Sequence, residues 1–137
     1  MNDVLPALRS ILLANADVVA LVGTRIYGER VNEADIGQGP NTQQAIELSL
    51  EPSGVGRRFN NLALQQVGVE LRCYGPTPYE AREVWRHAHQ CLKRAIRSTV
   101  DDVIIHSINP DMGPVSIIDP DTEWPVVWEL WSVIAAE

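Results

Sequence analysis

The C-terminal segment Glu123–Ala136 constrains the fold most, because its apolar residues fall on both faces of an expected β-strand. A strand of a two-layer domain normally buries one face and exposes polar side chains on the other. Pro125 cannot donate to a strand ladder, which places that end of the segment at a sheet edge or a bulge. We therefore expect one face to pack against helices and the other to meet another chain. The two faces are Trp124, Val126, Trp128 and Leu130 on one side and Val127, Trp131 and Val133 on the other.

A second strong pattern is the start of a helix at Thr77-Pro78-Tyr79-Glu80. The Thr77 hydroxyl can cap the helix, Pro78 suits the first helical position, and Glu80 completes a capping box. Apolar residues then recur at helical spacing to about Arg97, which predicts an amphipathic helix lying on a sheet. The expected buried face comprises Ala81, Val84, Trp85, Ala88, Cys91, Leu92, Ala95 and Ile96.

The other segments predict one more helix and several strands. The spacing of apolar residues from Val4 to Leu12 is typical of a helix, and Val18–Val22 is expected to form a short turn. Turn-rich residues 52–61 form the expected tip of a long hairpin, and residues 28–42 and 109–122 are expected to be loops. Strands are predicted at Thr24–Tyr27, Gln44–Glu51, Val67–Cys73 and Val103–Ile108.

The length of 137 residues is that of one domain, residues 1–137, from which the tip 52–61 and the loops 28–42 and 109–122 extend. The expected fold class is α+β: two helices packed on a largely antiparallel sheet of about four strands, with a long protruding β-hairpin. No apolar run approaches the ~20 residues of a membrane helix, so we expect no membrane partner. Cys73 and Cys91 form neither a disulfide framework nor a zinc-ligand spacing.

The charges of the chain are separated along the sequence. The net charge is −7, which disfavours a chain that binds nucleic acid along its surface. Five of the 11 basic residues lie between Arg82 and Arg97, and eight carboxylates follow from Asp101 to Glu137 without a basic residue. Two interpretations remain open: a solvated helix beside an acidic loop, or surfaces that complement each other between copies of the chain.

The sequence motifs predict no catalytic, cofactor-binding or metal-binding residue. His87 and His89 are two apart on a helix, so they do not face one another, and we expect both to be solvated on its polar face. Residues 119–123 lack the glycine and the final glutamate of a calcium loop. No nucleophile elbow, Walker loop or dinucleotide fingerprint occurs.

The candidate functional residues are therefore residues of protein contact. Two arginines and a phenylalanine on the glycine-flanked hairpin tip could contact another protein or pack back locally. Arginines of the basic helix and tryptophans of the last strand complete the set. The candidate interaction residues are Arg57, Arg58, Phe59, Arg82, Arg86, Arg94, Trp128 and Trp131.

The order of these segments resembles the tail-completion and tail terminator proteins of long-tailed bacteriophages. The resemblance rests on four segments in sequence and spans nearly the whole chain. They are the opening helix Asp3–Ala14, the stretch Val18–Tyr27 with its Gly-x-Arg-Ile-Tyr ending, the strand-into-helix from Val69 to Ala81, and the aromatic last strand. The sequence departs from the family in the loop 28–42 and in Glu51–Asn61.

This resemblance implies a virion protein without enzymatic activity, assembled in the host cytoplasm and located at the head-proximal end of the tail. It would form a homo-oligomeric ring, with a hexamer as the expected size, between the tail tube protein and a neck or connector protein. DNA would pass through the lumen without specific binding. The alternatives are a neck or head-completion connector, and a small enzyme or nucleic-acid-binding module that uses the face of Arg82–Arg97.

Overall fold

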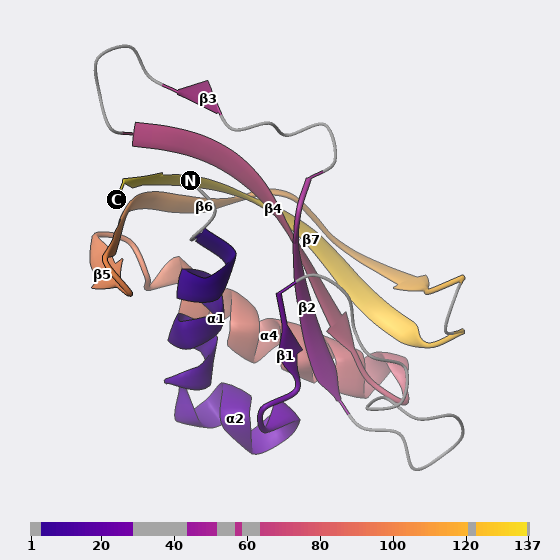
Figure 1. Cartoon of the computed structure of the whole chain (residues 1–137). Helices are drawn as coiled ribbons and strands as arrows, with labels where there is room; N and C mark the ends of the chain where they lie inside the picture. Colours follow the sequence, from indigo (N-terminus) through magenta and orange to yellow (C-terminus); the bar gives the residue numbers. More distant parts are fainter. Residues whose placement is uncertain (1–3, 29–43, 52–56, 59–63, 121–122, 137) are drawn as a thin grey trace.

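The computed structural model describes residues 4–28, 44–51, 57–58, 64–120 and 123–136. In this part of the chain, three helices and one curled sheet are formed (Figure 1). The helices are α1 (Val4–Leu13), α2 (Ala16–Val22) and α4 (Pro78–Lys93). The strands are β1 (Ile26–Tyr27), β2 (Ala45–Leu50), β3 (Arg57–Arg58), β4 (Leu64–Tyr74), β5 (Ser98–Val100), β6 (Val103–Ile118) and β7 (Pro125–Ala136).

The sheet has the order β1-β2-β4-β7-β6-β5, and β3 pairs with β4 beside this path. All pairs are antiparallel except β1 with β2, so the sheet is mixed. The long strand β4 pairs with β7 without a register shift from Leu64 opposite Ala136 to Tyr74 opposite Val126. The prediction of two helices on about four largely antiparallel strands is therefore wrong.

The missed helix and one missed strand are too short to show a pattern. Helix α2 has seven residues, and it is capped by Asn15, whose side chain accepts hydrogen bonds from the backbone of Asp17 and Val18. Strand β5 has three residues and follows Arg97, whose φ is +62°. Two turns of helix or three residues of strand carry too few positions for a periodicity to appear.

The prediction of a loop at 109–122 is also wrong, because β6 continues as a strand to Ile118. The prolines of this segment suggested a loop, since they cannot donate to a ladder. β6 pairs with β5 only from Val103 to Ile105, so beyond that point it is an edge strand in the described structure. An edge strand tolerates proline, and three register shifts against β7 absorb the irregular residues.

The hairpin of β2 and β4 forms as predicted, with Ala45 opposite Tyr74 and Leu50 opposite Val69. Its expected tip, residues 52–61, and the expected loop at 28–42 lie mostly outside the described residues. In the described chain, no single helix is long and apolar enough to cross a membrane, although the bent pair α1 and α2 passes by length and composition.

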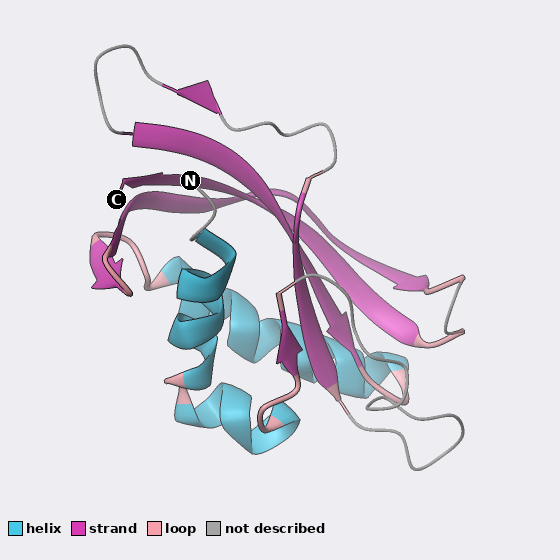
Figure 2. Ribbon diagram, viewed as in Figure 1, coloured by secondary structure: helices cyan, strands magenta, loops and turns pink. Residues whose placement is uncertain are grey.

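All three helices pack on one face of the sheet (Figure 2). The main core lies between them and contains Leu8 and Leu12 of α1, Leu71 of β4 and Leu92 of α4, each fully buried. Burying one such leucine contributes about 1.5–3 kcal/mol. The sheet face opposite the helices is free of helices throughout the described residues.

Helix α4 begins as the sequence predicts. The Thr77 hydroxyl oxygen accepts a hydrogen bond from the Glu80 backbone N–H at 3.2 Å, and Pro78 occupies the first turn. Its apolar face is buried except for Trp85, which is half-buried, and Ile96, which lies beyond the helix end and is 47% exposed. The helix ends at Lys93 rather than near Arg97, so Ile96 leaves the core while Ala95 stays buried.

The connection from β4 to α4 requires a glycine. A Cβ on Gly75 would lie 2.4 Å from the Ala81 backbone nitrogen and 2.8 Å from the Glu80 carbonyl carbon. These atoms belong to the first turn of α4, so they cannot move aside without displacing the helix.

We predict that Gly75→Ala lowers the free energy of unfolding by about 2 kcal/mol, because an overpacked site shifts backbone. Gly28→Ala is the matched control, since among the described residues no atom beyond its chain neighbours lies within 4 Å of the position that its added methyl group would take. Urea unfolding followed by tryptophan fluorescence measures both. Equal stability of the two variants would contradict the close approach of β4 and α4.

Candidate assembly surface

Strand β7 divides its residues between the two faces of the sheet. Val127, Trp131 and Val133 belong to the main core under the helices, and Glu129 contacts His89 of α4. Because side chains alternate along a strand, Trp128 and Leu130 lie on the opposite face. The sequence predicts two apolar faces for this strand. One of them is covered by α4, and the other is free of helices in the described chain.

The free face of β6 and β7 is apolar. Met112 pairs with Leu130, Val115 with Trp128, and Ile117 with Val126, and directly paired residues share a face. Met112 is 57% exposed, Val115 44% and Ile117 45%. We call residues 110–118 with 125–131 the arm, and Met112, Val115 and Ile117 the arm strip. An exposed, contiguous apolar strip of this kind marks an interaction site.

The same face becomes polar across β4 and β2. Nη1 of Arg72 lies 3.2 Å from Oε1 of Glu47, and its Nη2 lies 3.4 Å from Oε2 of Glu70. The Ser49 hydroxyl donates to Glu70 at 3.2 Å, and Nε1 of Trp128 donates to the same carboxylate at 3.4 Å. The carboxylates are thus neutralised within the sheet, while the arm strip has no polar network of this kind.

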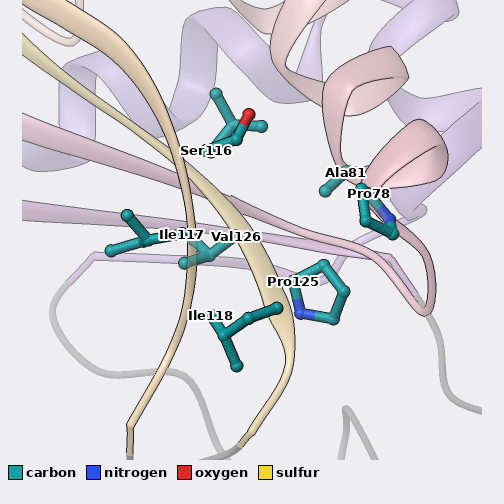
Figure 3. A pocket seen from close by; sticks show the side chains of 8 residues that line it. Pro78, Ala81, Ser116, Ile117, Ile118, Pro125 and Val126 are labelled. Atoms are coloured by element: carbon teal, nitrogen blue, oxygen red, sulfur yellow. The ribbon is translucent and has the colours of Figure 1, made fainter.

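A groove of about 410 Å³ lies between the arm and the start of α4 (Figure 3). Its walls are mostly apolar, and the Ser116 hydroxyl on its edge accepts a hydrogen bond of 3.4 Å from Arg82. It lies beside the last residues of the β6–β7 ladder, while Val127 and Trp131 of the arm belong to the main core under α4. Its walls include Pro78 and Ala81 of α4, Ile117 and Ile118 of β6, and Pro125 and Val126 of β7.

The end of the arm is fixed by a second, smaller core. Tyr74, Trp124, Val126 and Ala45 are buried together. The Tyr74 hydroxyl donates to Oδ2 of Asp119 at 2.9 Å. Burial raises the pKa of Tyr74 well above its usual range, and the Glu47 and Asp119 carboxylates raise it further. This contact ties the turn after β6 to β4.

The structure distributes the predicted interaction residues over several surfaces. Trp131 is fully buried under α4, so it offers no surface to a partner, whereas Trp128 is half-buried on the free face. Arg86 forms an ion pair of 2.7 Å with Glu83, and Arg82 reaches the arm. Arg94 caps the C-terminus of α4 and is exposed.

Of the predicted hairpin-tip residues, Arg57 and Arg58 form β3 through their backbone, opposite Gln66 and Gln65. Their side chains and the whole of Phe59 lie outside the described part of the chain. The tip therefore stays a prediction.

One buried polar pair was not predicted from the sequence. Nδ1 of His89 lies 2.9 and 3.0 Å from the two carboxylate oxygens of Glu129, which is fully buried. The imidazole lies between the rings of Trp85 and Trp131, each 5.1 Å away between centroids. The expectation that His89 is solvated on the polar face of the helix is thus wrong. A charged residue in phase with Val127 and Trp131 was the available signal.

The remaining nucleophiles are inert by position. Cys73 is fully buried; desolvation, and then the nearby Glu129 carboxylate, raise the pKa of its thiol well above its usual range. Burial also raises the pKa of Cys91. Across the described residues, no three His, Cys, Asp or Glu side chains gather as metal ligands would.

Comparison with known proteins gives a match in fold. No protein-family model and no curated protein matches this sequence. A chain in the solved structure of the virion of a native gene transfer agent particle has a similar fold, with a TM-score of 0.72 and 14% sequence identity. The match covers 98% of this chain and 95% of that chain. The likeness therefore extends over the whole fold rather than over a shared fragment.

We predict that His89→Ala lowers the free energy of unfolding by about 3 kcal/mol, because it leaves a buried carboxylate without its partner. In a Glu129→Gln background, the same substitution should lower it by only about 1 kcal/mol, since a neutral amide is easier to bury. Urea unfolding of the four chains of this double-mutant cycle at neutral pH measures the difference. Equal losses in both backgrounds would contradict a stabilising His89–Glu129 pair.

Proposed function

We propose that this chain is a structural protein of a phage or phage-like virion, and that it forms a ring at the head-proximal end of the tail. The observation that carries the proposal is the match, over nearly the full length of both chains, with a chain of the gene transfer agent virion, a phage-like particle. A fold can host many functions, so the likeness supports the class of protein and leaves its position in the particle as our inference.

The surface of the molecule supports an assembly role independently of that likeness. The arm strip exposes apolar side chains on a face where no described helix lies, which is unfavourable for a chain that stays alone in water. The resemblance of the sequence to tail terminator proteins gives the position: the ring would cap the tail tube and join it to the neck. A hexamer is the ring size that this resemblance implies.

The charge of the chain suits a ring through which DNA passes. A net charge of −7 offers few cations to the phosphate backbone, so DNA would move through the lumen without being held. A neck or head-completion connector would share this property. Pull-down with tube protein and with portal-side proteins separates the two positions, because a terminator retains the tube protein and a connector the portal-side protein.

We predict that the purified protein forms rings, alone at high concentration or on the ends of tail tubes. Light scattering gives the mass in solution, and negative-stain electron microscopy of the protein with and without tubes shows the particles. Rings at one end of each tube support the proposal. Monomers alone, with bare tube ends after mixing, would contradict it.

A further inference from the structure

One part of the sheet exposes apolar side chains beside carboxylates, and another exposes apolar side chains beside basic residues. Strand β6 has 16 residues and so spans about 50 Å. It begins beside β5, near the C-terminus of α4, and it ends at the tip of the arm (Figure 1). One of the two surfaces lies along the second half of β6, and the other lies near its start.

The arm end is apolar with an acidic rim. The arm strip lies between Asp111 and the turn that holds Glu123, and both carboxylates are exposed. Asp119 is held by Tyr74. Among the described residues, Arg82 donates a hydrogen bond to Ser116 of the arm. Ser116 faces α4, so this positive charge lies on the face opposite the arm strip. The arm strip itself is free of positive charge.

The other end exposes Ile96 and Ile104, and Ile96 has a basic rim. Ile96 is 47% exposed, and Lys93, Arg94 and Arg97 around it are all exposed. We call these four residues the basic corner. On the neighbouring β5–β6 turn, Asp101 accepts a hydrogen bond from Ser10 at 2.6 Å and Asp102 is exposed, so the basic corner keeps an excess of positive charge.

We propose that the arm of one copy docks on the basic corner of the next copy, a contact that rests on the ring proposed above. The arm strip would cover Ile96, and Asp111 and Glu123 would face Lys93, Arg94 and Arg97. Opposite potentials across an interface select the register and disfavour the pairing of two arms or of two corners.

This contact joins different surfaces of two identical chains, so it is heterologous. Heterologous contacts repeat head to tail and close into a ring when the rotation between copies allows it. A two-fold dimer could also use this contact, with the arm of each copy on the basic corner of the other. The mass of the assembly in solution separates the two, because a reciprocal dimer stops at two copies and a ring does not.

Charge reversal on each side tests the contact. One variant carries Asp111→Lys with Glu123→Lys, and a second carries Lys93→Glu with Arg94→Glu. The control, Arg86→Glu, reverses an exposed arginine of α4 whose described partner is Glu83 of the same helix. Circular dichroism verifies folding, and sedimentation velocity measures self-association over a range of salt concentrations.

We predict that each reversed variant self-associates about tenfold more weakly than the natural chain or worse. An equimolar mixture of the two should assemble again, because each reversed surface then meets its complement. The control should assemble as the natural chain does. Rescue on mixing also shows that both variants are folded.

Two outcomes would overturn the inference, and they are distinguishable. If both reversed variants assemble as well as the natural chain, the ring stands and its interface lies elsewhere. If the natural chain stays monomeric at ~1 mM and on tail tubes, the proposed function fails as well.

Discussion

The helices of this protein cover one face of its sheet, while the other face carries an apolar strip at one end. α4 packs across β4 and β7, and α1 lies against the same side. On the opposite face, edge strand β6 carries the arm strip, where no described helix lies. Apolar side chains on an uncovered sheet face stay exposed unless a partner covers them. The arm strip, with Met112, Val115 and Ile117 each more than two-fifths exposed, is the consequence.

The buried pair of His89 and Glu129 fixes the position of α4 along β7. Non-polar packing alone would allow α4 to slide along β7, because apolar surfaces are tolerant of small shifts. A carboxylate buried under the helix and paired with one imidazole favours a single register. Tyr74 and Asp119 fix the far end of β6 in a similar way. Both contacts tie the β6–β7 hairpin to the rest of the fold, one through α4 and one through β4.

The sequence predicted the parts whose signals are local and long. The cap at Thr77, the buried stripe of α4 and the hairpin of β2 and β4 are confirmed because each pattern extends over many residues. Helix α2 and strand β5 are too short for such a pattern. Pro110 and Pro114 suggested a loop because the edge position of β6, which tolerates them, depends on the pairing of strands far apart in sequence.

The candidate surface could be predicted only in part, because its local pattern is visible in the sequence and the pairing of distant strands is not. Two apolar faces on the last strand were visible in the sequence, yet only the register shows that Trp131 lies under α4 and Trp128 on the free face. The exposure of Ile96 could not be predicted either, because it depends on α4 ending at Lys93, three residues before it.

The most direct test of this account is hydrogen–deuterium exchange of β6 in dilute and in concentrated protein, at ~1 μM and ~1 mM. In the dilute chain, residues 110–118 lie on an edge strand and should exchange rapidly. As copies associate, the account predicts that these amides and those near Ile96 become protected together. Association detected by light scattering without any change in the exchange of either segment would contradict it.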